Sequence, residues 1–345
     1  MKALKPITII GGGLAGLTLG IGLRQRKIPT TVIEAGRYPR HRVCGEFISG
    51  MGREVLGRFE IEDTLRKAGA IESHSDLFRS QTAAGPIRPL PTRALSISRF
   101  VLDAELARRF QDLDGQLEEN QRWREADFGD GVVRATGRRL DSGKAKSPWL
   151  GLKMHARNVS LAADLEMHLI RGGYVGLCRL PNDEVNVCGL FHHHPAKSVG
   201  AGDVRSLLLG PSNSVLRQRL AGADFDENSF CSVAGISLDP VAARPGECCV
   251  GDALTMIPPV TGNGMSMAFE SAALALDPLA AYSEGSLSWP DVRQKIAGRY
   301  RLAFSSRLRW AKWLHAFLFS NLFKLLGPAA LRSELVWRTT FRHTR

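Results

Sequence analysis

Three glycines near the start of the chain have the spacing of a phosphate-binding turn. Gly11, Gly13 and Gly16 form a G-x-G-x-x-G pattern that follows an apolar, strand-like run and opens a helix-like stretch. The first glycine permits a tight turn, the second lets the backbone approach a pyrophosphate, and the third allows close packing of helix against strand. The N–H groups at the start of that helix would face the phosphate. The pattern predicts a dinucleotide site.

An acid follows the second strand of the same unit at the distance expected of a ribose-binding carboxylate. The apolar stretch 30–33 ends at Glu34, 18 positions after Gly16. Such an acid accepts hydrogen bonds from ribose hydroxyl groups. Strand, glycines, helix, second strand and acid all agree, which disfavours the alternative of an ordinary glycine-rich turn. The unit by itself does not distinguish NAD from FAD.

A second glycine-bearing turn lies near the other end of the chain. The segment 250–272 predicts a buried strand with Asp252 at its end, a corner of two prolines, and a helix opened by Gly262 and Gly264. The carboxylate can accept hydrogen bonds from a polyol chain. The backbone N–H groups near Gly264 and Met265 can face an anionic ring edge or a phosphate.

Together the two turns resemble those of the p-hydroxybenzoate-hydroxylase-like superfamily of FAD enzymes, and the chain is most similar to its geranylgeranyl-reductase-related branch. The resemblance covers nearly the whole chain. RYPRHRVCGEFISG at 37–50 is similar to the branch's Cys-Gly-Glu segment, and SRFVLDAEL at 98–106 to its flavin-domain arginine helix. RATGRR at 134–139 is similar to its second flavin-domain signature, and EMHLIRGGYVGLCRLPNDEVNVCGL at 166–190 to its substrate-sheet strands.

The resemblance implies FAD as the cofactor and assigns its contacts position by position. Glu34 would bind the adenosine ribose and Asp252 the ribityl chain, with the first turn on the pyrophosphate and the second on the isoalloxazine edge. Arg99 would approach the phosphates, and Arg42 would lie near the flavin. The implied cofactor-binding residues are Gly11, Gly13, Leu14, Ala15, Gly16, Glu34, Ala35, Arg42, Arg99, Gly251, Asp252, Pro259, Gly262, Gly264 and Met265.

Three residues are candidates for catalytic roles: Cys44, Glu46 and Tyr174. Cys44 would be a redox thiol beside the flavin or a small residue packed by the ring. Glu46 would be an acid or base, or a structural carboxylate paired with Arg42. Tyr174 would likewise be either a substrate-cavity residue or a structural one. Lys153 and His155 can line a substrate cavity, although a solvated strand face is the favoured interpretation.

Departures from the family pattern bear on the electron donor and the substrate class. The Asp-Gly that follows the middle strand in the hydroxylases is Thr136-Gly137 here, and an Ala-His pair is replaced by Leu254-Thr255. The branch's Tyr-x-Trp-x-Phe-Pro signature retains only Tyr174, and the W-x-W-x-I-P signature of tryptophan halogenases is missing. These differences leave both questions open without affecting the expectation of FAD.

The order of the predicted elements indicates an α/β fold with an α+β second layer. We expect a Rossmann-type FAD-binding domain, an inserted β-sheet substrate domain and a C-terminal helical segment. The segment 51–70 is predicted as one helix. The expected boundaries are 1–70, 99–142 and 241–290 for the discontinuous FAD-binding domain, 71–98 and 143–240 for the substrate domain, and 291–345 for the C-terminal helices and basic tail.

Charge and apolar residues near the end of the chain suggest a surface function for the last helices. The net charge is +12, and the last fifty residues hold many of the arginines. Aromatic and basic residues alternate there, which suits a membrane interface; a helix that closes over the flavin domain is the alternative. The bases elsewhere are scattered, so no nucleic-acid partner is predicted.

Cysteine and histidine usage predicts neither a disulfide framework nor a metal site. The six cysteines show no CxxC spacing, which favours free thiols in a cytoplasmic protein, with peripheral contact to the inner membrane face as an option. His192, His193 and His194 are adjacent, so on a strand they would point to opposite faces rather than to one ion. No apolar stretch is long enough to span a membrane.

These patterns favour an FAD-dependent oxidoreductase. We expect a monooxygenase, a hydroxylase that acts on an apolar aromatic, polyketide-like or lipid-like substrate. Its electrons would come from NAD(P)H as a transient donor or from a partner reductase, since the sequence has a single dinucleotide fold. One alternative is a flavin-dependent reductase that saturates C=C bonds of an isoprenoid-like lipid. Another is a non-catalytic, membrane-associated protein that holds flavin.

Overall fold

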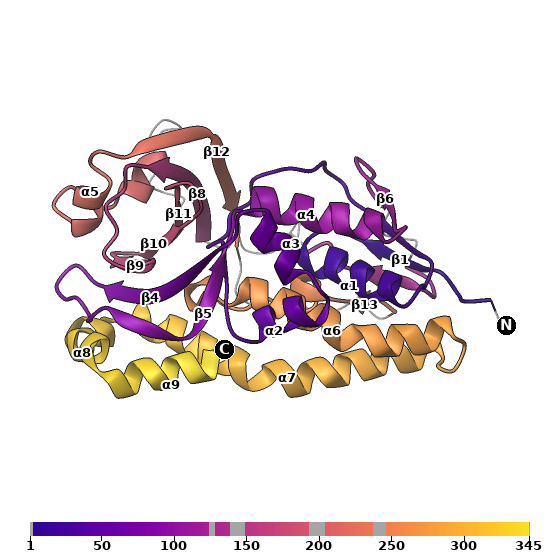
Figure 1. The fold of residues 1–345 in the computed structure, drawn as a ribbon. Coiled ribbons are helices and arrows are strands. Elements are labelled where there is room, and N and C mark those ends of the chain that lie inside the picture. Colours follow the sequence, from indigo (N-terminus) through magenta and orange to yellow (C-terminus); the bar gives the residue numbers. More distant parts are fainter. Residues whose placement is uncertain (1–2, 124–127, 139–148, 193–203, 237–245, 345) are drawn as a thin grey trace.

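Two β-sheets and a layer of C-terminal helices make up the molecule (Figure 1). The computed structural model describes residues 3–123, 128–138, 149–192, 204–236 and 246–344. One sheet is parallel and the other is mixed and strongly curved, with helices packed around both. This arrangement confirms the predicted α/β fold class.

The first sheet contains five parallel strands in the order β13-β7-β1-β2-β6. Its central strands are short apolar runs, as expected of a parallel sheet covered by helices. Helix α1 (Leu14–Gln25) is buried from its first residue to Leu23 because it lies between this sheet and the helices α4 (Arg99–Asp112) and α6 (Gly264–Ser283). The strands are β1 (Ile7–Ile10), β2 (Thr30–Ile33), β6 (Gln116–Glu118), β7 (Val132–Arg134) and β13 (Cys248–Cys249).

The second sheet contains eight strands in the order β12-β8-β11-β10-β9-β4-β5-β3, of which only β4 and β9 pair in parallel. One of its faces is apolar and is covered by the 3₁₀ helix η1 (Val204–Leu209) and by α5 (Val215–Arg219). The opposite face turns toward the first sheet. The strands are β3 (Phe47–Ile48), β4 (Ile71–Arg79), β5 (Arg88–Ser96), β8 (Trp149–Arg157), β9 (Leu165–Ile170), β10 (Gly173–Arg179), β11 (Val185–His192) and β12 (Asp224–Ala234).

Three C-terminal helices run beneath both sheets (Figure 1). They are α7 (Trp289–Leu318), α8 (Asn321–Arg332) and α9 (Glu334–Thr344), and serine N-caps start the first two. Among the described residues no single helix is long and apolar enough to cross a membrane. Only α7 and α8 taken together, with a bend of 106° between them, meet that test of length and composition.

The segment 51–70 forms two short helices, α2 (Met51–Arg58) and α3 (Glu62–Lys67), so the prediction of one helix is wrong. The chain breaks at Glu60, whose φ of 56° lies in the left-handed region.

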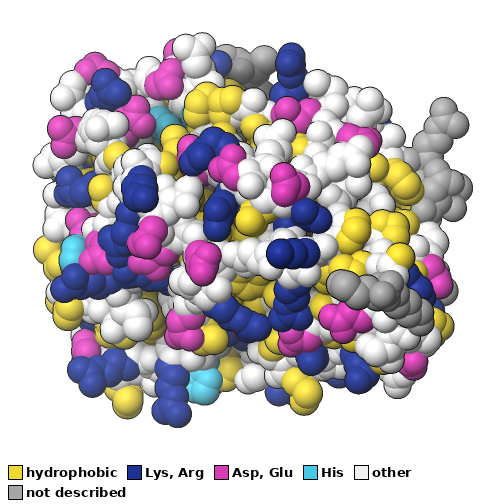
Figure 2. All heavy atoms as spheres, turned by 45° about the vertical axis from the view of Figure 1, so that its right-hand side comes forward, with side chains coloured by type: hydrophobic (Ala, Val, Ile, Leu, Met, Phe, Trp, Pro, Cys, Tyr) yellow, Lys and Arg dark blue, Asp and Glu magenta, His cyan; other side chains and the backbone are white. Residues whose placement is uncertain are grey.

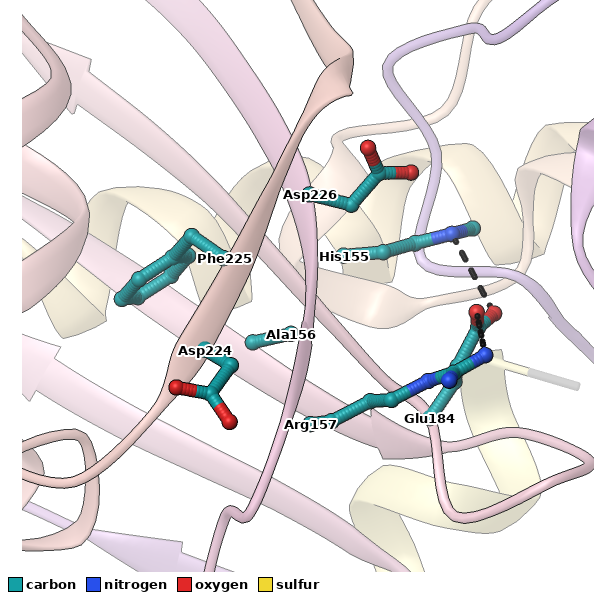
Figure 3. Close-up of a pocket in the computed structure, with 7 residues that line it drawn as sticks. All are labelled: His155, Ala156, Arg157, Glu184, Asp224, Phe225 and Asp226. Carbon is teal, nitrogen blue, oxygen red and sulfur yellow. Dashed lines mark hydrogen bonds and ion pairs between the residues drawn. The ribbon is translucent and has the colours of Figure 1, made fainter.

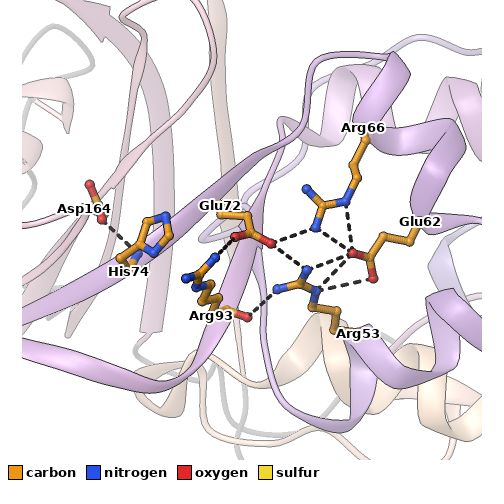
Figure 4. A network of polar contacts seen from close by, with 7 residues as sticks. All are labelled: Arg53, Glu62, Arg66, Glu72, His74, Arg93 and Asp164. Carbon is orange, nitrogen blue, oxygen red and sulfur yellow. Dashed lines mark hydrogen bonds and ion pairs between the residues drawn. The ribbon is translucent and has the colours of Figure 1, made fainter.

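A surface network of ion pairs connects these two helices to the second sheet (Figure 4). Glu72 of β4 accepts hydrogen bonds from Arg53 at 2.6 Å, from Arg66 at 2.7 Å and from Arg93 at 2.9 Å. Glu62 of α3 binds Arg53 and Arg66 as well. On the face drawn in Figure 2, Lys and Arg side chains are distributed among acidic and hydrophobic ones.

Candidate functional site

The first glycine turn has the geometry that a pyrophosphate requires. Gly11 has a φ of 108°, which favours glycine, and a side chain on Gly16 would collide with the Gly11 carbonyl. Gly13 is the N-cap residue of α1, and a Cβ built on it would meet no other part of the chain within 4 Å. Helix α1 begins without a side-chain cap, which leaves its first N–H groups to other acceptors.

Glu34 directly follows β2 and lies against this turn. Its carboxylate accepts hydrogen bonds from the backbone N–H of Gly12 and of Gly36, both at 2.8 Å, and from Arg40 at 2.6 Å. Burial alone would raise the pKa of Glu34, but the Gly36 hydrogen bond and the Arg40 charge outweigh it and lower the pKa. The Tyr38 hydroxyl donates to the Gly12 carbonyl. The acid is therefore ionised and fixed beside the turn.

Two arginines are held by one buried carboxylate, and one of them, Arg42, lies next to Glu34. Arg99 donates to the two Asp103 oxygens at 2.6 and 2.8 Å, and Arg42 donates to Asp103 at 3.1 Å. Arg42 also lies 4.0 Å from the Glu34 carboxylate. Burial would lower the pKa of Arg99, but the adjacent Asp103 raises it, so the guanidinium stays charged. Asp103 thus fixes the positions of both cations.

The second turn packs directly against the start of α1. A Cβ on Gly251 would stand 2.8 Å from the Cβ of Ala15, so the two turns meet although they lie at opposite ends of the chain. Among the described residues, the Asp252 carboxylate has neither a hydrogen bond nor an ion pair. Burial raises its pKa to about 6, against the charges of Arg99 and Arg138. A carboxylate in this position can accept hydrogen bonds from the hydroxyl groups of a ligand.

The segment after Asp252 leads into helix α6, whose first residue is a glycine. Pro259 lies in a short 3₁₀ helix, η3 (Pro259–Thr261), and Gly262 follows it with a φ of 62°. Helix α6 begins at Gly264 without a side-chain cap, and no atom lies within 4 Å of a Cβ built on Gly264. The Asn263 side chain donates to the backbone carbonyl of Thr344 at 2.6 Å. The last helix therefore holds this turn in place.

These residues fit an extended dinucleotide such as FAD. The structure brings together two helix starts without side-chain caps, an acid anchored beside the first turn and an unpartnered acid in the second. Leu14 and Ala15 form the first turn of α1, Ala35 directly follows Glu34, and Met265 is buried in the first turn of α6. Their assignment to individual parts of FAD stays a prediction.

The inner face of the second sheet is apolar at one end. Tyr174 of β10 pairs with Leu190 of β11 and is buried with Leu169 of β9. Val260 of η3 belongs to the same cluster, and so does Phe323 of α8. Burial raises the pKa of the Tyr174 hydroxyl well above its usual range. The cluster places Tyr174 beside the second turn, in apolar surroundings.

The other end of this face carries a buried polar network centred on Glu46. One carboxylate oxygen accepts from His155 Nε2 at 2.7 Å. The second accepts from the Arg99 backbone N–H at 2.8 Å and lies 3.4 Å from Lys153 Nζ. Burial would raise the pKa of Glu46, but the His155 hydrogen bond and the Lys153 charge lower it. Lys153 and Glu46 have no exposed surface, and Lys153 Nζ lies 3.0 Å from His41 Nδ1.

Two expectations about this network are wrong. Lys153 and His155 do not lie on a solvated strand face: both are buried, because alternate residues of β8 point inward to Glu46. Glu46 is not paired with Arg42, which binds Asp103 instead. Glu46 itself stands at a φ of 62° and contacts the backbone of Arg99, so it joins the sheet face to the predicted phosphate side.

Cys44 lies between the two ends of the face. Its carbonyl accepts a hydrogen bond from Asn186 of β11 at 2.8 Å. Burial raises the pKa of the Cys44 thiol, although Arg99 acts in the opposite direction. A thiol is therefore favoured over the thiolate that redox exchange requires. The structure brings Cys44, Glu46 and Tyr174 to one sheet face, and their catalytic roles stay predictions.

A cavity of about 300 Å³ opens behind His155, between β8 and β12 (Figure 3). It is bordered by three acids, Glu184, Asp224 and Asp226. His155 Nδ1 lies 3.6 Å from Glu184 while its Nε2 contacts Glu46. The imidazole thus connects this opening to the buried carboxylate. None of the predicted cofactor-binding residues borders it.

Several residues of the site were missed by sequence reasoning. Tyr38, Arg40 and Asp103 surround Glu34 and the two arginines, and His41 joins the network around Lys153. The spacing of Arg99 and Asp103, four positions apart on a helix, was a usable signal. His192 lies at the exposed end of β11 with its ring against Trp149, and His193 and His194 lie outside the described residues.

The fold is that of FAD-dependent monooxygenases and halogenases. No protein-family model matches the sequence, and no curated protein matches it either. Similarity to solved structures nevertheless extends over nearly the whole chain.

Three solved structures illustrate this similarity. p-Nitrophenol 4-monooxygenase PnpA from Pseudomonas putida DLL-E4 is 15% identical, with a TM-score of 0.77 over 99% of this chain and 98% of its own. The flavin-dependent brominase Bmp2 is 14% identical, with a TM-score of 0.76 over 99% and 95%. The myxobacterial chondrochloren halogenase CndH is 16% identical, with a TM-score of 0.72 over 100% and 96%.

Proposed function

We propose that this protein is an FAD-dependent oxidoreductase and, more specifically, a monooxygenase that hydroxylates an apolar aromatic or lipid-like substrate. The observation that carries the proposal is the meeting of two glycine-bearing turns, where Gly251 contacts Ala15 beside the unpartnered Asp252. Solved structures with this fold include a p-nitrophenol monooxygenase and two flavin-dependent halogenases, which supports flavin chemistry.

The chain's own residues would bind and orient the flavin. Glu34 would receive the ribose hydroxyls, the N–H groups of α1 the pyrophosphate, and Asp252 the ribityl hydroxyls. Arg42 and Arg99 would offset the phosphate charge. When bound, the reduced flavin would supply the electrons that allow oxygen transfer to the substrate. The start of α6 at Gly264 would stabilise negative charge on the ring edge.

The apolar character of the substrate is inferred from the surroundings of Tyr174. This side chain lies among Leu169, Leu190 and Val260, so a ligand between the second turn and the sheet would meet hydrocarbon and one hydroxyl. A charged ligand would lose its hydration there without compensation. Lys153 and Glu46 neutralise each other farther along the same face, where the network can hold or move a proton.

Electrons would come from NAD(P)H bound transiently or from a separate reductase. The sequence has a single G-x-G-x-x-G pattern, and Thr136 stands where the hydroxylases carry an acid. A lost acid at this point would weaken direct handling of the nicotinamide nucleotide. Rates of flavin reduction by NADH and NADPH, measured with and without an added general flavin reductase, distinguish the two routes.

Binding of FAD is the first test. Purified protein is titrated with FAD and followed by flavin fluorescence and absorbance. Asp252→Asn should weaken binding about tenfold, equivalent to ~1.4 kcal/mol, because the amide cannot offer two acceptor oxygens. The matched control is Asp112→Asn at the end of α4, where the side chain is 49% exposed and far from the turns. Failure of the unmodified chain to take up FAD would overturn the proposal.

The reaction itself is tested with the reconstituted protein and a panel of apolar phenols, polyketides and isoprenoid lipids. Isotopically labelled oxygen gas should leave one labelled oxygen atom in the product of a hydroxylase. Gain of two hydrogen atoms under anaerobic conditions would favour the alternative reductase that saturates C=C bonds. Uptake of FAD without turnover in either assay would favour a flavin-holding protein without catalysis.

A further inference from the structure

Helix α8 carries two apolar stripes, one buried and one exposed. Phe323, Gly327 and Leu331 face inward and are buried. The other stripe has the helical spacing i, i+3, i+4 and i+7 and faces outward; it consists of Leu322, Leu325, Leu326 and Ala329. The leucines of this outer stripe are 53%, 76% and 46% exposed. A soluble helix with a single core needs only the first stripe.

The neighbouring helices extend this apolar surface. Trp313 of α7 is 56% exposed, and Leu335 and Val336 of α9 are also exposed. Both helices pack against α8. Of the eleven large hydrophobic side chains exposed in the described part of the chain, seven lie on α7–α9. Such a concentration marks an interaction surface rather than scattered surface residues.

The same segment carries most of the charge of the protein. Residues 289–345 contain 12 Lys and Arg but only 2 Asp and Glu, a net charge of +10 out of +12. One of the two acids, Glu334, is engaged by Arg88 and Arg338. The surface that contacts these helices must therefore tolerate apolar side chains and attract cations.

We propose that the outer stripe of α8, flanked by Trp313 and Leu335, docks into the surface of an anionic lipid bilayer. Helix α8 has 12 residues, too few to span a bilayer, so it would lie in the plane of the interface with its leucines inserted. Lys324, Arg332 and their neighbours would contact the anionic lipid headgroups. A tryptophan at this level is typical of membrane interfaces.

This inference goes beyond the proposed reaction and does not depend on it. It has one consequence for the site, because the inner stripe of α8 belongs to the cluster around Tyr174 and Val260. The helix that touches lipid on one side lines the apolar end of the sheet face on the other. In this arrangement only α8 would separate an apolar substrate dissolved in the bilayer from that sheet face.

The test is co-sedimentation of the full-length protein with vesicles. Vesicles of phosphatidylcholine alone are compared with vesicles that also contain phosphatidylglycerol. We expect binding to the anionic vesicles, weakened at least tenfold by raising the salt concentration and weakened as strongly in L322S/L325S. The matched control is Val233→Ser, because Val233 is 44% exposed but lies on β12, away from α8 and α9. Circular dichroism and FAD titration of the same samples report folding and cofactor binding independently.

Three results would overturn the proposal. The first is the absence of binding to either kind of vesicle. The second is binding that L322S/L325S leaves unchanged, since the apolar stripe would then have no part in it. The third is a change from dimer to monomer in L322S/L325S without any change in vesicle binding, which would make the stripe a contact between two copies of the chain.

Discussion

Two ionic networks in this protein contrast in burial and in what they connect. The surface network joins Arg53, Arg66 and Arg93 to Glu62 and Glu72 between α2–α3 and the second sheet (Figure 4). It is partly open to water, where ion pairs are screened and contribute about 0–1 kcal/mol each. Its position indicates a structural role, namely fixing two short helices against the sheet.

The central groups of the second network are buried. Glu46 and Lys153 have no exposed surface, and His155 is 3% exposed. Removing such charges from water costs several kcal/mol for each ion, and their attraction only offsets that cost, so stability does not explain the network. It lies between the predicted phosphate side at Arg99 and the sheet face. The contrast teaches that burial without a stability gain is the better indicator of function.

The largest expected effect comes from breaking the buried network at one partner. Glu46→Gln should destabilise the protein by about 3–5 kcal/mol, because Lys153 would be left buried without a counter-charge. Urea unfolding followed by circular dichroism measures the change. The double variant E46Q/K153M should recover part of the loss. Equal and additive losses in the two single variants would show that the two groups do not depend on each other.

The pH dependence of stability should distinguish the buried network from the surface network, because only the buried one contains His41. Burial, with the charges of Lys153 and His155, lowers the pKa of His41 to about 4 from 6.5. Because the unfolded chain binds the proton first, His41 contributes stability above pH 6.5, and this is lost as the pH falls toward 4. The urea midpoint should fall between pH 7 and 5 by a smaller amount in His41→Asn. An identical fall of the urea midpoint in the unmodified protein and in His41→Asn would show that His41 does not contribute to this pH dependence.

The smallest expected effect belongs to the surface network. Glu72→Gln should change the free energy of unfolding by less than about 1 kcal/mol, and added salt should erase the difference. Its three arginine partners lower the pKa of Glu72 to about 2, so its contribution is present above pH 4.5 and disappears only as the pH falls through 2. A loss comparable to that of Glu46→Gln would abolish the contrast between the networks.

Local patterns allowed much of the fold and the nucleotide turns to be predicted. Gly11, Gly13 and Gly16 act within a few residues of one another, and Glu34 follows from the length of one strand–helix–strand unit. The surroundings of Glu46 could not be predicted, because its partner His155 lies 109 positions away. Lys153 and His155 have the alternation of an exposed strand face, and only the third dimension shows what covers them.

The helix at 51–70 and the resemblance to one family branch show a different limit. A helical period continues through residue 60, but the backbone turns there with a positive φ that the pattern does not encode. The similarity to the geranylgeranyl-reductase-related branch and the catalytic role of Tyr174 stay predictions. They depend on a ligand, whose identity is set by a few side chains rather than by the periodicity of the elements.

The position of β13 at one edge of the parallel sheet has a consequence for biosynthesis. This strand pairs with β7, and the residues that follow it complete the first turn by resting on Ala15. During synthesis, more than two hundred residues must therefore be added after the glycine cluster at 11–16 before β13 and the residues that contact Ala15 are available. Until then the edge of β7 that pairs with β13 is exposed in the nascent chain. We therefore expect this polypeptide to benefit more from an early chaperone than a protein whose neighbouring strands are adjacent in sequence.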